Sequence, residues 1–299
     1  FLKGKPKIIT NTDFNYCMGY SGIFVKCLIT KIGKKRQFAL CSVMTDKGVR
    51  DFTNDLVGKE IYLDKQSIED LIEFQDAELK ILNGYYYDDG HNPKIKEVIR
   101  YLYDTRRQKK REGNPIQEVY KLIMNSSYGK TILKPIDTET DIVNEFKKDK
   151  ETGKWENFWR KYLGKNYNYI KEFIKVGKEY VVKKHKTIEQ HFNNAHIGVE
   201  VLSKSKNIMN KVICLAEDLG LTAYTQDTDS IHMDYDEVAI LSKEYKKKYN
   251  FDITGSDMGQ FHIDFELKGT CGNCGKCEKG CGAEIWATDS IFLGKKCYI

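Results

Sequence analysis

The chain has 299 residues, and its 49 Lys and Arg against 43 Asp and Glu give a formal net charge of +6. This excess is mild for a nucleic-acid-binding protein, but the basic residues gather in runs that suit a phosphate backbone. No apolar run is long enough to cross a bilayer and no signal peptide is apparent. We therefore exclude a membrane-spanning protein and expect one that is soluble and not secreted.

The first part of the chain has the pattern of a β-rich region. Residues 22–32 are apolar with the spacing of a strand, and Gly33 with Lys34 offers a turn. Ser67 then opens an amphipathic helix, which we expect to end before Gly84.

The next segment predicts a helix whose two faces differ in chemistry. Asn114 as N-cap and Pro115 at the first helical position mark its start. At 100° per residue, Lys121, Asn125 and Tyr128 share one narrow face. This face suits a nucleotide, although a solvated polar face with an incidental Tyr is the alternative. The opposite face is apolar and is expected to pack against the protein; it carries Ile116, Val119, Tyr120 and Ile123.

A basic run lies on the preceding predicted helix. Arg106 and Lys110 are one helical turn apart and close in sequence to Lys121, so they could join a phosphate clamp, and Lys109 is an equally plausible member. The alternative is a solvated helix face. The charged connection that follows, with Trp155 and Trp159, shows no clear pattern.

The most informative segment is an acidic turn between two predicted strands. A helix over residues 208–216 stops at Gly220, and residues 221–224 and 230–235 have strand patterns. Asp227 and Asp229 would therefore project together from a hairpin tip. Carboxylate oxygens are the ligands of hard cations such as Mg²⁺, whereas the alternative is an ordinary Asp-rich turn. His232, on the second strand, is read as a strand histidine with a satisfied ring.

Four cysteines close together form a separate element. Glycines between them would let the loop wrap an ion, and four thiolates can close a structural zinc site. The spacing is also that of an iron–sulfur run, although Gly282 replaces the customary Pro. Unligated thiols in an insertion loop are the third reading. The four residues are Cys271, Cys274, Cys277 and Cys281.

Taken together, two of these motifs resemble those of a known enzyme family. Lys121-x-x-x-Asn125-Ser126-x-Tyr128-Gly129 followed by Asp227-Thr228-Asp229-Ser230 is similar to the fingers and palm motifs of family B DNA polymerases, in the protein-primed branch of viruses, phages and linear organellar plasmids. Near the end, Lys296-Cys297-Tyr298 is similar to the element that grips the primer in this family.

The resemblance implies a role for each matched residue. Asp227 and Asp229 would be the catalytic carboxylates that hold two Mg²⁺ ions, with Asp229 the surer ligand. Lys121 would meet the triphosphate, and Asn125 and Tyr128 would line the nucleotide pocket. The primer-gripping residues would be Lys296 and Tyr298.

The chain also departs from the family pattern. The family's other metal-binding Asp, in a segment with a Leu-Tyr-Pro signature, is not found, and Asp13 is read as an ordinary residue of the region after that motif. No proofreading exonuclease motifs precede it, and no thumb follows. The sequence is therefore interpreted as a central palm and fingers piece of a longer polymerase.

These observations predict an α+β fold with a polymerase palm, helical fingers and an N-terminal β-rich insertion. The expected parts are a β-rich palm and insertion region (1–92), helical fingers (93–134), a palm with the acidic hairpin (135–268), and a Cys-rich loop with the start of the primer-gripping region (269–299). The expected function is template-directed DNA synthesis by two-metal catalysis. The alternative is a catalytically inactive nucleic-acid-binding fragment with a thiol-ligated structural metal.

The expected partners follow from the same resemblance. They are template–primer DNA, deoxynucleoside triphosphates and a terminal priming protein, with no membrane. We expect the protein in the cytoplasm or a viral replication compartment of a host cell, with an organelle as the alternative.

Overall fold

The computed structural model describes residues 1–150, 152–187, 190, 193–255, 257–262, 289–294 and 297–298. The chain divides into two compact units. Unit 1 comprises residues 1–92 and 200–299, and unit 2 comprises residues 93–199. Within the described residues, every pairing between named strands is antiparallel and helices accompany the sheets, which confirms the expected α+β class. No helix in these ranges is long and apolar enough to span a bilayer.

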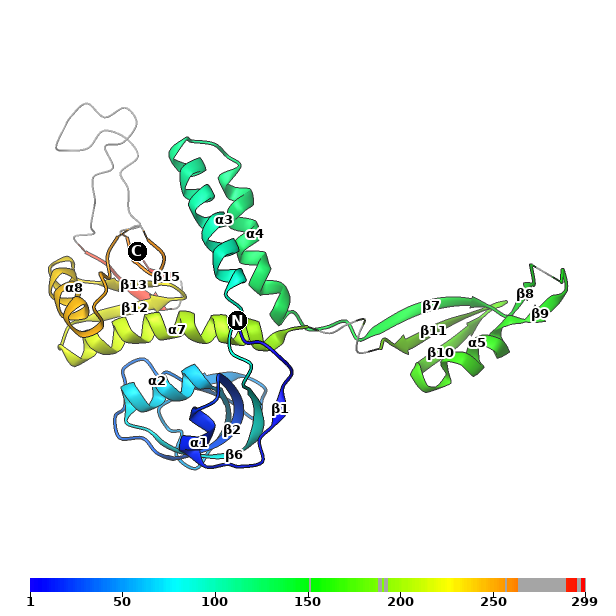
Figure 1. Cartoon of the computed structure of the whole chain (residues 1–299), viewed down its shortest axis with the longest axis horizontal. Helices are drawn as coiled ribbons and strands as arrows, with labels where there is room; N and C mark the ends of the chain where they lie inside the picture. Colours follow the sequence, from blue (N-terminus) through cyan, green and yellow to red (C-terminus); the bar gives the residue numbers. More distant parts are fainter. Residues whose placement is uncertain are drawn as a thin grey trace. The chain divides into compact units, whose positions relative to one another are not determined.

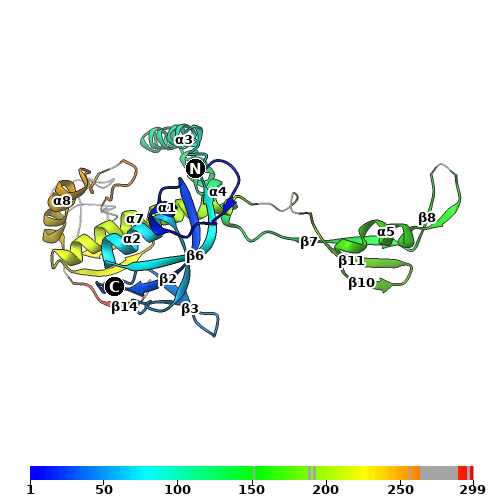
Figure 2. The same ribbon diagram turned by 60° about the horizontal axis from the view of Figure 1, so that its bottom comes forward.

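The N-terminal part of unit 1 is built on a four-stranded sheet with the strand order β1-β6-β2-β5. Strands β2 and β6 pair at its centre (Figure 2). The apolar segment predicted as a strand forms β2, whose inward residues are buried while their neighbours are partly exposed. The elements of this part are β1 (Lys7–Ile8), α1 (Phe14–Met18), β2 (Gly22–Lys31), β3 (Ser42–Met44), β4 (Arg50–Phe52), β5 (Glu60–Asp64), α2 (Lys65–Gln75) and β6 (Glu78–Tyr87).

Helix α2 starts and stops earlier than its sequence pattern indicated. Asp64 is its N-cap, and its carboxylate accepts hydrogen bonds from the backbone N–H and the hydroxyl of Ser67. The helix ends at Gln75 because Asp76 adopts a left-handed conformation (φ 47°) and returns its N–H to the carbonyl of Leu71. Strand β6 then occupies the interval before Gly84, where no strand was expected.

Gly84 of β6 allows two strands to approach closely. It has φ +154°, and a Cβ added there would lie 2.3 Å from the carbonyl oxygen of Phe24 and 2.7 Å from the Cα of Val25. Both neighbouring atoms belong to the backbone of β2 and cannot turn aside. A side chain at this position would therefore push β6 away from β2.

In the C-terminal part of unit 1, two helices pack against one face of the acidic hairpin. Its elements are α7 (Ala195–Asp218, which begins in unit 2), β12 (Ala223–Asp227), β13 (Ser230–Met233), α8 (Tyr235–Tyr249), β14 (Phe292–Gly294) and β15 (Cys297–Tyr298). Val212, Leu215 and Ala216 of α7 pack with Leu241 and Tyr245 of α8. Ile231 and Met233 of β13 cover this core, so the inner face of the hairpin is fixed by apolar packing.

Two antiparallel helices form the first part of unit 2 (Figure 1). They are α3 (Lys94–Arg111) and α4 (Gln117–Gly129), followed by the short 3₁₀ helix η1 (Lys130–Ile132). The predicted start of α4 is two residues too early: the helix begins at Gln117, and its N-cap is Ile116 instead of Asn114. The side chain of Asn114 accepts a hydrogen bond of 3.0 Å from the backbone N–H of Ile116, in the turn before the helix.

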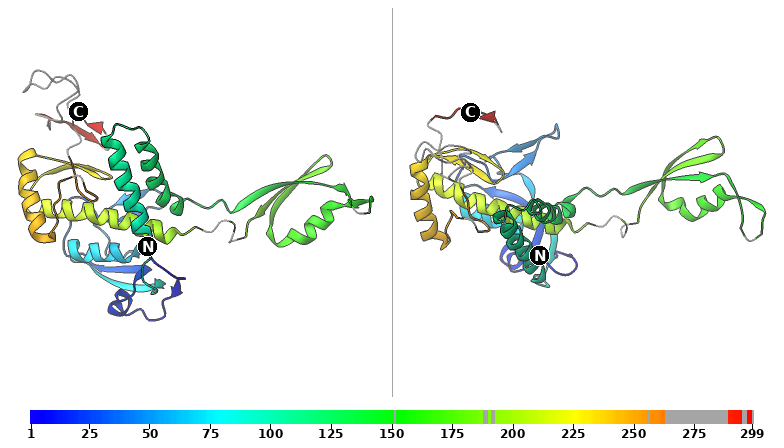
Figure 3. Two further views of the ribbon diagram at one scale, coloured as in Figure 1. Left: turned by 45° about the horizontal axis from the view of Figure 1, so that its top comes forward. Right: turned by 90° about the horizontal axis from the view of Figure 1, so that it is seen from above.

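The rest of unit 2 contains a small α/β module between α4 and α7 (Figure 3). Its three-stranded sheet has the order β10-β11-β7, and α5 packs on it around Val143, Trp159, Tyr180 and Val182. Trp159 stacks on Tyr180 at 4.0 Å between ring centroids. The elements are β7 (Thr138–Asn144), β8 (Phe146–Lys148), β9 (Trp155–Asn157), α5 (Phe158–Asn166), η2 (Tyr167–Tyr169), β10 (Ile170–Val176) and β11 (Glu179–His185).

Candidate catalytic site

The two predicted carboxylates lie at the tip of the β12–β13 hairpin in unit 1. Asp227 is the last residue of β12 and pairs with Ser230, the first residue of β13. Thr228 and Asp229 form the two-residue connection. The Asp227 side chain is half-buried and that of Asp229 is exposed. The expected hairpin, with both residues at its tip, agrees with this geometry.

The backbone of the tip is tight and strained. The N–H of Asp229 donates to the carbonyl of Asp227 at 2.7 Å, and the hydroxyl of Ser230 donates to the same carbonyl at 3.1 Å. The residue between the carboxylates, Thr228, has φ 57°, which is unfavourable for a β-branched side chain. Such strain costs about 1–3 kcal/mol and is typical of functional positions. The hydroxyl of Thr228 also donates to the Asp227 carboxylate at 3.2 Å.

The donors at this tip fit a magnesium ion. Mg²⁺ is bound in many phosphoryl-transfer sites by one or two carboxylates, with water and substrate phosphates completing the shell. Asp227 and Asp229 supply two such carboxylates, and within the described ranges no Lys or Arg forms an ion pair with Asp229. Across the same ranges, no group of three His, Cys, Asp or Glu side chains gathers to hold a metal ion.

Aromatic and acidic side chains brace the outer face of the hairpin. Tyr224 stacks on Phe292 of β14 at 5.6 Å, and its hydroxyl donates to the carboxylate of Asp234 at 3.0 Å. The hydrogen bond to this carboxylate raises the pKa of Tyr224. His232 meets the ring of Phe292 edge-on at 5.5 Å, in keeping with its reading as a strand histidine with a satisfied ring.

The remaining predicted nucleotide-binding residues lie on the two helices of unit 2. Arg106 and Lys110 are on α3, and Lys121, Asn125 and Tyr128 are on α4 at spacings of four and three residues, which place them on one helical face. Lys121 and Asn125 are exposed, whereas Tyr128 is half-buried. These residues belong to unit 2 and the acidic hairpin to unit 1, so the geometry of each group is considered only within its own unit.

Arg106 has a more buried position than a solvated helix face would give. Its Nε atom is shielded from solvent without a hydrogen-bond partner in the described chain, and the same holds for Oε1 of Gln117 on α4. A buried guanidinium donor without a partner is costly, so a ligand oxygen that reached it would be stabilised.

One prediction about α4 is wrong. The apolar face was expected to pack, but Ile116, Val119 and Ile123 are 45, 52 and 44 % exposed, and Tyr120 alone of this face is half-buried. Helix α4 lies beside α3, and the half-buried positions along it are Gln117, Tyr120, Met124, Tyr128 and Gly129. An isolated pair of helices buries only the stripe between them, so an apolar residue outside that stripe stays exposed.

Other predicted site residues fall wholly or partly outside the described residues. These are Cys271, Cys274, Cys277 and Cys281 of the four-Cys loop and Lys296 of the primer-gripping element. Tyr298 lies in β15, whose backbone pairs it with Phe292. Asp13 is the N-cap of α1, and its carboxylate accepts a hydrogen bond of 2.9 Å from the N–H of Tyr16.

The sequence did not reveal two buried polar residues that hold α7 in place. Asp70 of α2 accepts hydrogen bonds from the amide groups of Asn207 and Asn210 at 2.6 and 2.7 Å, and burial raises its pKa despite these bonds. Arg36, which is buried, binds Asp218 at the end of α7. The contact of Asp70 could have been suspected from the sequence only through the two amide residues, Asn207 and Asn210, three positions apart on α7. No sequence feature indicates the contact between Arg36 and Asp218.

Comparison with known proteins places the chain in a family. Residues 3–216 match the family described as DNA polymerase type B, organellar and viral. The chain therefore belongs to the organellar and viral type B DNA polymerases, which confirms the expected resemblance. The match includes the Lys121–Tyr128 motif and ends before Asp227 and Asp229. The interpretation of the hairpin as a metal site therefore depends on its residues and geometry and not on the family match.

Individual relatives cover only parts of the chain. A DNA polymerase of Acidianus bottle-shaped virus (isolate Italy/Pozzuoli) is 46% identical over 56 residues, which are 18% of this chain and 9% of the relative. Phi29 DNA polymerase in an orthorhombic crystal form has a TM-score of 0.45 at 16% identity, covering 78% of this chain and 35% of that one. Phi29 DNA polymerase complexed with primer-template DNA has a TM-score of 0.43 at 16% sequence identity, and the match covers 77% of this chain and 34% of that one. The chain thus spans about a third or less of the length of these relatives.

Proposed function

We propose that this chain supplies part of the active site of a DNA-directed DNA polymerase, which adds deoxynucleotides to a primer 3′-hydroxyl on a DNA template by a two-metal mechanism. The observation that carries the proposal is the strained hairpin tip that holds Asp227 and Asp229 two residues apart, in a chain of the type B polymerase family.

Each residue has a role in this proposal. Asp227 and Asp229 hold Mg²⁺, which when bound stabilises the negative charge of the transferring phosphoryl group. Lys121 binds the triphosphate with Arg106 and Lys110. Asn125 and Tyr128 line the base and sugar pocket, and Lys296 with Tyr298 holds the primer end; the α3–α4 helices then act as the fingers (93–134) and the hairpin as part of the palm (135–268).

The distribution of charge supports a nucleic-acid partner for unit 2. Residues 93–199 contain 24 Lys and Arg against 14 Asp and Glu, a net charge of +10, whereas the remainder of the chain carries −4. A surplus of this size on one compact unit attracts a phosphate backbone and makes binding depend on salt. Template–primer DNA and deoxynucleoside triphosphates are therefore the proposed partners, with a terminal priming protein as a further one. The setting is the compartment in which a viral or organellar genome is copied.

The test combines primer extension with metal binding. A labelled primer–template, deoxynucleotides and Mg²⁺ are incubated with the protein or its Asp229→Asn variant, and Mn²⁺ binding is followed in parallel by electron paramagnetic resonance. The variant should extend the primer at least about 100-fold more slowly, since several kcal/mol of charge stabilisation is lost. It should also bind Mn²⁺ more weakly.

Asp236→Asn is the matched control, because Asp236 is an exposed carboxylate nearby, at the start of α8. It should leave both readouts unchanged. Extension that proceeds equally in Asp229→Asn would show that this carboxylate is not a catalytic ligand. Mn²⁺ binding without extension by any form would favour the alternative of an inactive nucleic-acid-binding fragment.

A further inference from the structure

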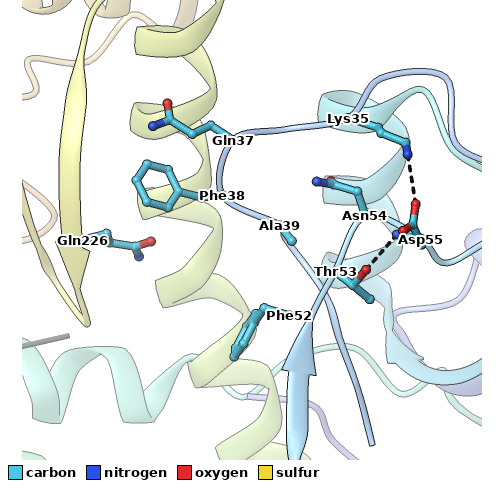
Figure 4. Close-up of a pocket in the computed structure, with 9 residues that line it drawn as sticks. All are labelled: Lys35, Gln37, Phe38, Ala39, Phe52, Thr53, Asn54, Asp55 and Gln226. Atoms are coloured by element: carbon cyan, nitrogen blue, oxygen red, sulfur yellow. Dashed lines mark hydrogen bonds and ion pairs between the residues drawn. The ribbon is translucent and has the colours of Figure 1, made fainter. Parts of the chain in front are cut away.

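A cavity of about 590 Å³ lies beside the acidic hairpin in unit 1 (Figure 4). One wall is the segment after β2, a second is the end of β4 with the segment after it, and the third is Gln226 of β12. Ligand pockets in proteins have volumes of about 300–1,000 Å³. The lining residues are Lys35, Gln37, Phe38, Ala39, Phe52, Thr53, Asn54, Asp55 and Gln226.

The wall after β2 is held firmly to the helix that leads into the hairpin. Buried Arg36 donates to the carbonyl of Phe74 at 2.6 Å and to the carboxylate of Asp218 at 2.5 Å. The backbone N–H of Gln37 donates to Glu217 at 3.3 Å. Because Glu217 and Asp218 end α7, these bonds fix the wall relative to the helix just before β12.

The wall after β4 is fixed to the first one. The side chain of Asn54 donates to the carbonyl of Arg36 at 2.8 Å and accepts from its N–H at 3.2 Å. It also accepts a hydrogen bond of 2.8 Å from Gln75. The cavity is therefore formed before any ligand arrives, which lowers the entropic cost of binding.

The lining suits a flat ring with polar edges. Phe38 is half-buried and Phe52 is 58 % exposed, so both rings have surface available to a ligand. In Figure 4 the side chains of Phe38 and Gln226 point toward each other across the cavity. In the part of the chain that the structure describes, the amide groups of Gln37 and Gln226 have no hydrogen-bond partner, so each offers donors and an acceptor.

Other ligand classes fit this lining less well. The one cation, Lys35, is paired with Asp55 at 2.9 Å, which argues against a site for phosphate alone. A single carboxylate is too few for a metal ion, and the amide groups would be left unpaired by a purely apolar molecule. Aromatic rings that stack on a base, with amides that read its edge, are how proteins hold unpaired nucleobases.

We propose that this cavity binds a single unpaired nucleobase. Gln226 immediately precedes Asp227 and pairs across the hairpin with Ile231, which faces the core between α7 and α8. Directly paired residues lie on the same face of an antiparallel ladder, so Gln226 shares the face of Ile231. Successive residues of a strand point to opposite faces, so the base lies on the other side of β12 from the carboxylate of Asp227. The site is thus distinct from the proposed metal site, and it can take a base from a single-stranded DNA segment or from a free nucleotide.

Photo-cross-linking tests the proposal directly. A single-stranded oligodeoxynucleotide that carries 5-iododeoxyuridine is irradiated with the protein in EDTA, and tryptic peptides are analysed by mass spectrometry. Cleavage after Arg36, Lys47, Arg50 and Lys59 places Phe38 in peptide 37–47 and Phe52 in peptide 51–59. We expect the cross-linked mass on one or both of these peptides.

Two variants separate the site from the rest of the surface. Phe52→Leu keeps an apolar side chain but removes the ring, and it should weaken the cross-link at least about fivefold, given what stacking contributes per base. Gln37→Leu should also weaken it, because an edge contact is lost. Tyr62→Leu is the control: Tyr62 is 80 % exposed in the same unit but does not line the cavity, so the yield should not change.

Competition identifies the source of the base. Unlabelled oligodeoxynucleotide that displaces the probe, while free deoxythymidine triphosphate does not, assigns the site to a DNA strand; the reverse result assigns it to a nucleotide. Cross-links found only on other peptides, or equal yields from Phe52→Leu and the parent protein, would overturn the proposal. Because EDTA excludes catalysis, these results are independent of the Asp229→Asn experiment.

Discussion

Replacing Arg36 by Met should lower the free energy of unfolding of unit 1 by about 3–5 kcal/mol. The Arg36 side chain is 3 % exposed and binds the carbonyls of Phe74 and Cys214 together with the carboxylate of Asp218. Met fills a similar volume but donates no hydrogen bond. Two carbonyls therefore lose a charged donor, at about 1.5–3 kcal/mol for each such bond, while Asp218 keeps its ion pair with Lys34.

The assay is urea unfolding followed by amide hydrogen exchange, which reports the two units through separate peptides. The midpoint for unit 1 should fall with an unchanged slope, whereas the midpoint for unit 2 should not move. Lys35→Met is the matched control, because Lys35 is the neighbouring residue and its ion pair with Asp55 is on the surface. Such a pair contributes about 0–1 kcal/mol. Equal losses in Arg36→Met and Lys35→Met would refute the reasoning that buried hydrogen bonds fix this segment.

Three further predictions concern the backbone and the pH dependence. Gly84→Ala should lower the free energy of unfolding by about 2–3 kcal/mol, as measured by urea denaturation, since its Cβ would meet the backbone of β2. Gly113→Ala, which shares a positive φ but has open space around it, should cost less, and equal costs would contradict the steric argument. Thr228→Gly should raise the free energy of unfolding by up to about 1 kcal/mol, because it relieves a left-handed β-branched residue; a loss would show that the tip is unstrained. Burial opposes ionisation of Asp218, but the hydrogen bonds from Arg36 and Lys34 prevail and lower its pKa. A lowered pKa in the folded state means that stability present above pH 3.8, the ordinary value for this carboxyl, is lost as the pH falls below it. Asp218→Asn should therefore flatten the pH dependence of unfolding in this range, and an unchanged slope would count against it.

Local sequence patterns predicted the features whose causes are local. The strand at residues 22–32 was predicted by its apolar residues, and the start of α4 was predicted to within two residues by Asn114 and Pro115. The acidic hairpin was predicted because strand patterns flank Asp227 and Asp229 on both sides. In each case, the forces that decide the conformation act within a few residues.

Features that depend on distant partners were not predictable in the same way. Asp70 meets Asn207 and Asn210 across 137 and 140 residues, and the cavity joins residues 35–55 to Gln226. The exposed apolar face of α4 shows the converse: periodicity indicates which residues share a face, but not whether anything covers them. The roles of Lys121, Asn125, Tyr128, Arg106 and Lys110 toward a nucleotide stay predictions.

The two ends of the small module between α4 and α7 lie next to each other. Its first strand, β7, pairs with its last, β11, so that Thr138 lies opposite His185, and the N–H of Lys186 donates to the carbonyl of Asp137 at 2.8 Å. The module also has an apolar core of its own. A segment with adjoining ends can be lengthened, shortened or exchanged over evolution without altering where the chain leaves α4 and enters α7, so this family can vary an accessory element here while the flanking helices keep their course.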